Sequence, residues 1–402
     1  MNQDFILKNR DIVIVGQQPW DIEIGSNCKN IAIEFSKHNS FLYVNSPLDR
    51  ITKLKPKKDQ KIKKRINVIK GKEEAIVQIA NNLYNYYPDE MIESINWIKN
   101  EALYNYLNKV NNKRFARSIN RAIAQLGFKN VILFNDNDIF RCFYLKEFLR
   151  PALSIYYSRD YLLYVDYWKR HGEKLEPELI RKSDICVANS TYLANYCQQY
   201  NKNAYYVGQG CDLSTFSDKQ AMAIPADMVN IPQPIIGYVG ALQSLRLDID
   251  LIAHISEERP DWSIVLVGPE DNEFKASRLH QKPNVHFLGS KAPELLPQYI
   301  NAFNVCLNPQ LTNQVTIGNY PRKIDEYLAM GKPVVATRTE AMSVFSEHTY
   351  LGKTKKIYVP LIEQALREDS EEKRQERIRF AATHTWENNV MEIYKAIAAV
   401  QH

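Results

Sequence analysis

The 402-residue chain lacks the long apolar run that a membrane-spanning helix needs. Such a helix takes about 20 consecutive apolar residues, and no stretch of the sequence approaches that length. The first ten residues, MNQDFILKNR, also lack the apolar core of a secretory signal. With 45% hydrophobic and 24% charged residues, the composition is that of a soluble globular protein. We therefore expect a cytoplasmic protein.

Cysteine is scarce and scattered. No C-x-x-C pair occurs, and no histidine stands at metal-ligand spacing from a cysteine. The sequence therefore predicts reduced, mostly buried thiols, with neither a disulfide framework nor a metal site. The six cysteines are Cys28, Cys142, Cys186, Cys197, Cys211 and Cys306.

No internal repeat of solenoid period is present. Apolar strands instead alternate with segments of helical periodicity, which predicts the α/β class with doubly wound, parallel sheets. The length suggests two domains at about 100–200 residues each. The expected strands cover residues 11–15, 41–45, 131–134, 153–157, 185–188 and 204–207 in the first half, and 235–239, 262–267, 285–288, 304–307 and 333–337 in the second.

The strand–helix pattern stops between the two halves. Residues 213–234 hold three prolines and little periodicity, so we interpret them as a linker. The first domain is then expected to span residues 1–212 and the second 235–378, with a terminal helical segment over 379–402.

The most informative segment runs from Asn319 to Thr337 and predicts a short helix followed by a buried strand. Pro321 suits the first helical position. Ile324, Tyr327 and Leu328 then form one apolar stripe. Glycine at 331 and proline at 333 end the helix.

Lys323 and Glu326 project from one side of this helix near its start. That end carries free N–H groups and the positive end of the helix dipole, which favour a phosphate. A cation beside the phosphate and a carboxylate near a sugar diol would bind a nucleotide diphosphate. The alternative is an ordinary amphipathic helix with solvated lysine and glutamate.

The segment PRKIDEYLAMGKPVV at 321–335 resembles the donor-site signature P-x-K-x-x-E-Y-L-A-x-G-K-P-V-V of GT-B glycosyltransferases. The resemblance implies that Glu326 binds the nucleotide ribose and that Lys323 contacts the diphosphate. It also implies two Rossmann-like domains that face a central cleft, and a last helix that crosses back to the first domain.

Loops after the strands of the second half supply further donor-binding candidates. Gly240 permits a close backbone turn, and Arg246 stands just before a helix, where a diphosphate would rest. The alternative for Arg246 is a surface ion pair with Asp248 or Asp250.

Gly268 and Gly289 each follow a strand, and a side chain there would block a nucleotide's approach. Asn319 and Tyr320 precede the signature helix and are candidates for contact with the donor sugar. The sequence departs from the retaining subclass at Gly318, where those enzymes often carry a second glutamate. We therefore lean towards an inverting reaction.

Inverting transfer needs a base that takes the proton of the acceptor hydroxyl. Asp160 follows the strand at 153–157, and Tyr157–Tyr161 ends in the Asp-Tyr pair of the Y-x-x-x-D-Y element of teichuronate- and xanthan-type polysaccharide glycosyltransferases, which it resembles. In inverting members that aspartate is the expected base. A structural salt bridge of Asp160 with Arg159 or Arg170 is the alternative.

Three further residues of the first half are candidates on the acceptor side. Asp136 follows a strand and, with Asp138, could contact acceptor hydroxyls or cap its own loop. Gly16 ends the first strand, and Trp20 could stack on a sugar ring or act as a packing anchor.

The net charge of +6 is concentrated in one basic segment, residues 53–65. Such a segment gains about 1 kcal/mol per cation near an anionic membrane, which predicts peripheral membrane association. A solvated loop is the alternative, and the chain shows no nucleic-acid-binding motif. The cations are Lys53, Lys55, Lys57, Lys58, Lys61, Lys63, Lys64 and Arg65.

The sequence thus predicts a metal-independent glycosyltransferase without a cofactor. It would move a sugar from a nucleotide diphosphate donor to a glycan or lipid-linked oligosaccharide in bacterial surface polysaccharide synthesis. A sugar-nucleotide epimerase of the same fold is one alternative, and a non-catalytic sugar-nucleotide or glycan binder is another.

Overall fold

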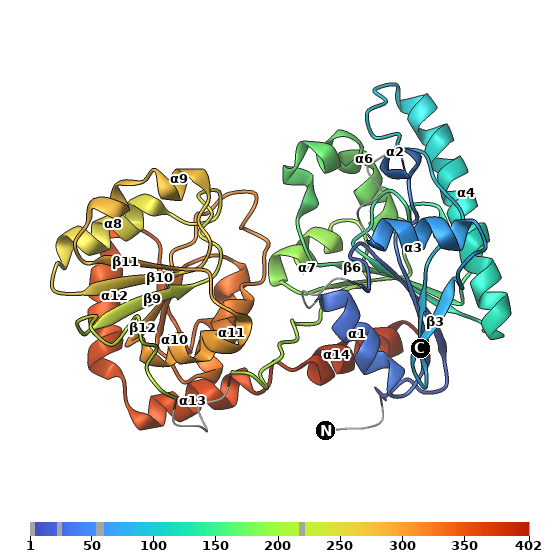
Figure 1. The fold of residues 1–402 in the computed structure, drawn as a ribbon. Helices are drawn as coiled ribbons and strands as arrows, with labels where there is room; N and C mark the ends of the chain where they lie inside the picture. Colours follow the sequence, from blue (N-terminus) through green and yellow to red (C-terminus); the bar gives the residue numbers. More distant parts are fainter. Residues whose placement is uncertain (1–4, 22–25, 54–59, 217–221, 402) are drawn as a thin grey trace. The chain divides into compact units, whose positions relative to one another are not determined.

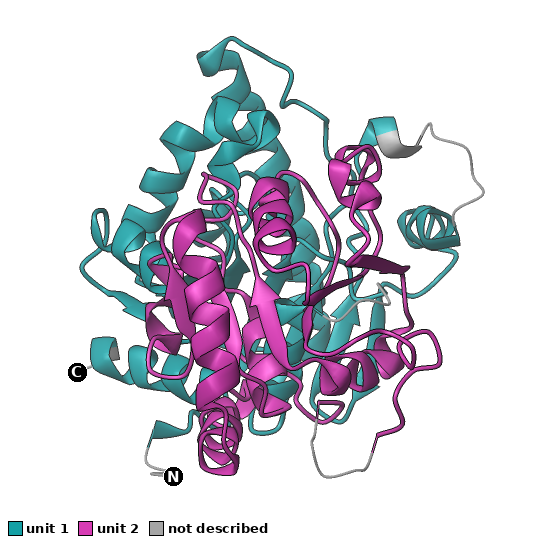
Figure 2. Ribbon diagram, turned by 90° about the vertical axis from the view of Figure 1, so that its left-hand side faces the viewer, with its two compact units in different colours: residues 1–208, 389–402 teal, residues 209–388 magenta. Residues whose placement is uncertain are grey.

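The computed structural model describes residues 5–21, 26–53, 60–216 and 222–401. The chain forms two compact units, coloured in Figure 2: unit 1 comprises residues 1–208 and 389–402, and unit 2 comprises residues 209–388. In each unit helices lie on both sides of a central sheet (Figure 1). The predicted α/β class with two doubly wound domains is confirmed.

Unit 1 is built on an eight-stranded sheet in the order β3-β4-β2-β1-β5-β6-β7-β8. All adjacent strands are parallel except β3 and β4. This hairpin corrects the expectation of a purely parallel sheet, and it lies at the edge, where β3 is largely exposed. The strands are β1 (Asp11–Gly16), β2 (Ser40–Val44), β3 (Ile76–Ala80), β4 (Leu83–Tyr86), β5 (Ile132–Asp136), β6 (Leu153–Ser158), β7 (Ile185–Ala188) and β8 (Ala204–Tyr206).

The helices of unit 1 include the last helix of the chain, whose Tyr394 packs edge-on against Phe35 at 5.0 Å between ring centroids. The Asn39 amide also donates to the Tyr394 hydroxyl at 3.1 Å. The helices are α1 (Asn27–Ser36), α2 (Arg50–Lys53), α3 (Gln60–Ile69), α4 (Glu101–Leu126), α5 (Leu145–Leu149), η2 (Leu162–Tyr164), α6 (Asp166–Lys182), α7 (Thr191–Gln198) and most of α14 (Trp386–Gln401).

Unit 2 contains a six-stranded sheet in the order β11-β10-β9-β12-β13-β14, with every pair parallel. The strand order reverses between β9 and β12, and ligands of such sheets bind at the carboxyl ends of strands at this point. The strands are β9 (Ile235–Val239), β10 (Ser263–Val267), β11 (Val285–Gly289), β12 (Val305–Asn308), β13 (Val334–Thr337) and β14 (Tyr350–Gly352).

Helix α11 (Arg322–Ala329) is the predicted signature helix, with Pro321 at its N-cap. It ends where the sequence predicts, because Gly331 takes a left-handed φ of 70°. The N–H groups of Gly331 and Lys332 then bond the carbonyls of Leu328 and Tyr327. The other helices of unit 2 are α8 (Ile249–Glu258), α9 (Asn272–Lys275), η3 (Arg278–Gln281), η4 (Pro293–Leu295), α10 (Leu296–Ala302), η5 (Ala341–Phe345), α12 (Lys355–Glu368) and α13 (Glu371–Ala381).

The observed division differs from the expected domain limits of 212 and 378. Residues 213–234 were expected to be a linker, but Met228 is buried in the core of unit 2, and the Tyr299 hydroxyl donates to Asp227 at 3.0 Å. At the other limit, Ala381, which follows residue 378, is buried in the core of unit 2. Both segments therefore pack on unit 2, whereas residues 217–221 lie outside the described residues.

A buried hydroxyl fixes α11 against the sheet. The Tyr327 side chain is fully buried and its hydroxyl accepts the Val239 N–H at 2.9 Å. Replacement by phenylalanine leaves that N–H unpaired, so we expect Tyr327→Phe to lower the free energy of unfolding by about 1–3 kcal/mol. Urea denaturation measures the change.

The control Tyr106→Phe alters a tyrosine that is 66% exposed on α4, and it should change stability by less than about 0.5 kcal/mol. Equal stability of Tyr327→Phe and the wild type would contradict this role.

Candidate functional site

The start of α11 lies at the carboxyl end of β9 and carries Lys323. The Lys323 ammonium donates to the Tyr238 hydroxyl and lies 4.0 Å from the centroid of that ring. No side-chain oxygen caps the helix, because its N-cap is Pro321. A fixed ammonium and a helix N-terminus without a side-chain cap are thus found together, and both attract an anion.

Two glycines bring the backbone close to this ammonium. An added Cβ at Gly240 would lie 2.9 Å from Lys323 Nζ, and φ at Gly240 is 140°. At Gly268, where φ is 153°, an added Cβ would lie only 2.0 Å from the Gly240 carbonyl oxygen. The turns after β9 and β10 therefore pack directly on each other beside Lys323, as only glycines allow.

Glu326 lies one turn further along α11. Its side chain is 20% exposed, and Arg322 Nη2 lies 3.9 Å from its carboxylate. Burial raises the pKa of Glu326, and the nearby Arg322 and Lys323 cations lower it by less. A buried carboxylate with such limited pairing has unused acceptor capacity, as a residue that binds a diol would need.

Arg246 does not form the alternative ion pair. Its side chain is exposed, and no carboxylate pairs with it among the described residues; Asp248 lies 3.7 Å and Asp250 3.6 Å from Lys355 instead. The Arg246 carbonyl accepts the Leu311 N–H at 2.8 Å, which ties this turn to the loop after β12. The guanidinium thus stands free on a loop at the switch point.

The remaining donor-site candidates are Gly289, Asn319 and Tyr320, and the two polar side chains among them contact groups other than Lys323 and Glu326. Gly289 ends β11, at the edge of the sheet and two strands from β9. The Asn319 amide donates to the Val315 carbonyl at 2.8 Å. Tyr320 is buried, and its hydroxyl lies 3.3 Å from His384 Nδ1. The expectation that the Tyr320 hydroxyl contacts a donor sugar is thus corrected: the ring serves to pack the core.

Sequence reasoning missed a polar cluster under α11. Asp325 is fully buried; His384 Nδ1 lies 2.5 Å from its Oδ1, and Cys211 donates to its Oδ2 at 3.1 Å. The three residues are far apart in sequence, so no spacing signals them. Tyr238 was missed for the same reason, because it resembles any other apolar strand residue.

In unit 1, Asp160 follows β6 with 46% of its side chain exposed, and Arg159 Nη1 lies 3.4 Å from it. The Asn137 side chain accepts the N–H groups of Arg159 at 2.6 Å and Asp160 at 3.3 Å. This exposed carboxylate is therefore held on a loop of defined shape, and the predicted pair with Arg159 is present as well.

The structure corrects the acceptor role expected for Asp136. This carboxylate is fully buried and lies 2.9 Å from Arg159 Nε. Burial raises the pKa of Asp136, and the Arg159 charge opposes that rise. Asp136 thus holds Arg159 and is inaccessible to a substrate.

Gly16 and Trp20 serve packing near Tyr43. An added Cβ at Gly16 would lie 2.6 Å from the Tyr43 hydroxyl. The Trp20 ring packs edge-on against Tyr43 at 5.1 Å between centroids, and the Trp20 backbone N–H donates to the Asn45 side chain at 2.8 Å. These contacts support a packing role for Trp20 rather than stacking on a sugar ring.

The basic segment is described only in part, since residues 54–59 with Lys55, Lys57 and Lys58 lie outside the described residues. Lys64 lies 4.3 Å above the Tyr87 ring, and Arg65 lies 3.5 Å from Asp21. These two cations are engaged within unit 1. The side chains of Lys61 and Lys63 on α3 are exposed.

All six cysteines are buried free thiols. Within the described part of the chain, no three metal-binding side chains gather in one place, and no helix is both long and apolar enough to cross a bilayer.

The pKa of Glu326 leads to a pH-dependent prediction. The pKa of Glu326 is raised in the folded state, so the wild type loses stability as the pH rises from the unfolded-state pKa through the folded-state pKa. A glutamine at this position does not titrate, so the variant does not show this loss. We expect Glu326→Gln to match the wild type near pH 4 and to be more stable above pH 7. Urea denaturation at both pH values measures the difference.

The matched control is Glu294→Gln, which changes an exposed glutamate of unit 2 and should alter stability by less than about 0.5 kcal/mol at either pH. A Glu326→Gln protein that is less stable than the wild type above pH 7 would mean that the carboxylate has a stabilising partner in the folded protein.

Comparison with known proteins agrees with this geometry. Residues 233–368 match the family model described as glycosyl transferases group 1. A curated relative from Bacillus subtilis, the putative teichuronic acid biosynthesis glycosyltransferase TuaH, is 23% identical over 280 residues, which cover 63% of this chain and 70% of that protein. These matches favour the glycosyltransferase prediction over the epimerase and the non-catalytic binder.

Solved structures share the fold along the whole chain. Sucrose-phosphate synthase from Thermosynechococcus elongatus matches with a TM-score of 0.64 at 14% identity, covering 98% of this chain and 99% of its own. A trehalose-6-phosphate protein from E. coli gives 0.66 at 10% identity, covering 98% and 99%. Anabaena HepE gives 0.57 at 15% identity with the same coverage. The family model thus matches residues 233–368 of unit 2, and the solved structures show that the chain as a whole has the GT-B fold.

Proposed function

We propose that the protein transfers a sugar from a nucleoside diphosphate sugar to a glycan or lipid-linked oligosaccharide in bacterial surface polysaccharide synthesis. Two similar structures support the donor class: HepE was solved with UDP and glucose, and the E. coli protein with UDP-2-fluoro glucose. The teichuronic acid relative supports the acceptor class. The observation that carries the proposal is the Lys323 ammonium held over the Gly240–Gly268 turns at the start of α11.

The donor diphosphate would lie against these turns. Glycines at 240 and 268 leave the backbone open to close approach, and Lys323, Arg246 and the helix dipole stabilise the charge that develops on the departing diphosphate. Glu326 would accept hydrogen bonds from the ribose hydroxyls. Because these protein cations supply the positive charge, we infer that transfer needs neither a metal ion nor a cofactor.

Asp160 would act as the general base of an inverting reaction. It takes the proton of the acceptor hydroxyl while that oxygen attacks the anomeric carbon and the bond to the diphosphate breaks. Its 46% exposure leaves the carboxylate open to a substrate, and the buried Asp136 holds the neighbouring Arg159 in place.

We further propose that the protein associates with an anionic membrane surface through the basic segment. The exposed Lys61 and Lys63 of α3 and the other cations of residues 53–65 would each gain about 1 kcal/mol near such a surface. A lipid-linked acceptor would be found there.

Loss of the Lys323 cation tests the donor site. We expect Lys323→Ala to weaken binding of UDP by about 10- to 100-fold, because a charge-assisted contact is lost. Gly240→Ala should have a similar effect, since its new Cβ would displace the Lys323 ammonium. Isothermal titration calorimetry with UDP measures both.

The control for the second variant is Gly127→Ala. Gly127 also has a positive φ of 69°, but it ends α4 with no atom within 4 Å of an added Cβ, so UDP affinity should be unchanged. Normal UDP binding by Lys323→Ala and Gly240→Ala alike would place the diphosphate elsewhere.

The Asp160→Asn variant tests the base. We expect turnover of a nucleotide sugar with acceptor to fall by about 10²- to 10⁴-fold, while UDP affinity stays the same because Asp160 belongs to the other unit. Glu173→Gln removes an exposed carboxylate of α6 and should leave turnover unaltered. Full activity of Asp160→Asn would exclude the aspartate from the mechanism.

A further inference from the structure

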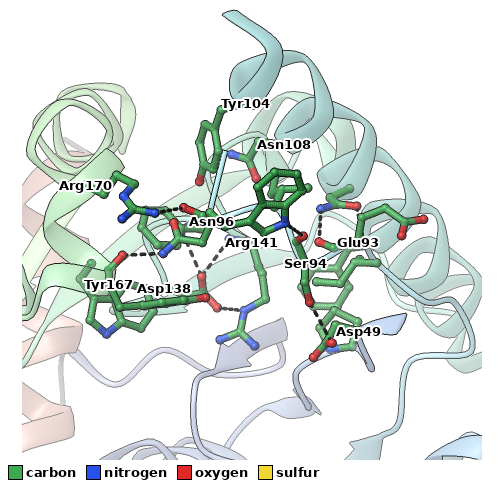
Figure 3. A pocket seen from close by; sticks show the side chains of 18 of the residues that line it. Asp49, Glu93, Ser94, Asn96, Tyr104, Asn108, Asp138, Arg141, Tyr167 and Arg170 are labelled. Carbon is green, nitrogen blue, oxygen red and sulfur yellow. Dashed lines mark hydrogen bonds and ion pairs between the residues drawn. The ribbon is translucent and has the colours of Figure 1, made fainter. Parts of the chain in front are cut away.

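Unit 1 contains a cavity of about 510 Å³ that no sequence motif indicated (Figure 3). Its walls come from the segments that follow β2, β4 and β5, from α4 and from the start of α6. None of the acceptor-side candidates Gly16, Trp20, Asp136 and Asp160 lines it. Its volume falls within the roughly 300–1,000 Å³ of small-molecule sites.

The cavity has aromatic walls and an aromatic rim. Tyr104 and Phe115 are 1% exposed and Phe140 is 8% exposed, so these rings form its buried part. Two other lining residues, Trp97 and Tyr167, are 68% and 56% exposed. Exposed flat rings at the edge of a cavity present apolar faces on which the C–H face of a sugar ring can stack.

Polar atoms without partners lie among these rings. Asn108 is 3% exposed, and its Nδ2 has no hydrogen-bond partner among the described residues; nor does the buried Oδ1 of Asn96. Figure 3 shows both amides among the cavity side chains. An unpaired buried donor or acceptor costs about 1–3 kcal/mol of stability. The hydroxyl groups of a bound sugar would remove this cost, because a hydroxyl can both donate and accept a hydrogen bond. A hydrocarbon chain would leave Asn108 Nδ2 and Asn96 Oδ1 unpaired.

The charges argue against a phosphate as the occupant. The lining residues include four carboxylates and two guanidinium groups, and Asp138 and Arg141 pair with each other at 2.5 Å. Phosphate sites carry an excess of cations, so neither the nucleotide donor nor a lipid diphosphate suits this cavity. The carboxylates are Asp49, Glu93, Asp138 and Asp166, and the guanidinium groups are those of Arg141 and Arg170.

The cavity lies next to the loop that carries the candidate base. Asp138 forms part of its wall, and the preceding residue, Asn137, accepts the backbone N–H of Asp160. A chain of sugar units that enters the cavity would therefore extend from the same loop that holds Asp160.

We propose that this cavity is a subsite for neutral sugar units of the acceptor glycan, with Trp97 and Tyr167 stacking on the sugar rings and Asn108 donating to a hydroxyl. The assignment of these sugars to an acceptor rests on the proposed function. The proposal explains why the cavity combines exposed aromatic faces, unpaired amides and no excess of positive charge.

Saturation-transfer difference NMR on the full chain tests the proposal. The probes are a panel of methyl glycosides of neutral hexoses, 6-deoxyhexoses and N-acetylhexosamines and of their disaccharides, with farnesol as the apolar probe. We expect at least one glycoside to bind the wild type and to bind Trp97→Ala about three- to tenfold more weakly, as the loss of a stacking contact predicts. Asn108→Leu should weaken it as well, whereas Tyr106→Ala, an exposed residue of α4 outside the cavity, should not.

Trp97 is mostly exposed, so its removal should leave the fold intact, and a thermal melt checks this. Binding of UDP by the same samples separates the two proposals. If UDP binds but no glycoside does, or if the glycoside signal is unchanged in Trp97→Ala, the subsite proposal is wrong. Binding of farnesol in a Trp97-dependent manner would also overturn it. If glycosides bind and UDP does not, the proposed transferase function fails while the sugar site stands.

Discussion

The contact between the start of α11 and the end of β9 is the constraint on which unit 2 depends. The Tyr327 hydroxyl ties the helix to the Val239 N–H, and Lys323 contacts Tyr238 of the same strand. Since the helix cannot shift along the strand without breaking both contacts, its N-terminus stays over the turn at Gly240. Lys323 and the helix N-terminus, both proposed to act on a diphosphate, are positioned by this packing, so the proposed donor site and the core depend on the same contacts.

Glu326 shows how the site differs from the core around it. A mostly buried carboxylate whose cation, Arg322, lies as far away as 3.9 Å costs stability, as its raised pKa indicates. Proteins retain such groups where a ligand supplies the missing partner. Neighbouring Asp325 is also buried, but His384 and Cys211 satisfy it. Two adjacent acidic residues on one helix thus differ, because Asp325 has two close partners and Glu326 has acceptor capacity left for the proposed ligand.

Unit 1 also contains two nearby acidic residues, of which one is buried and paired and the other is exposed. The buried Asp136 holds Arg159, and the exposed Asp160 is the neighbour that a substrate can reach. The loop between β5 and α5 serves two surfaces, because Asn137 shapes the Asp160 loop while Asp138 lines the aromatic cavity. A base and a sugar subsite that share one loop would place an acceptor in a fixed relation to the reacting hydroxyl.

The sequence by itself determined the two α/β units, most strands to within a residue or two, and the limits of α11, since periodicity, Pro321 and Gly331 act locally. It also indicated Lys323 and Glu326 through a contiguous motif. Only the tertiary structure decided that Asp136 and the Tyr320 hydroxyl are buried, that residues 213–234 pack on unit 2, that Tyr238 contacts Lys323 and that His384 contacts Asp325. The aromatic cavity likewise appears only on folding, because its walls come from five separate segments. Burial and long-range pairing depend on which segments meet, and no local pattern encodes that.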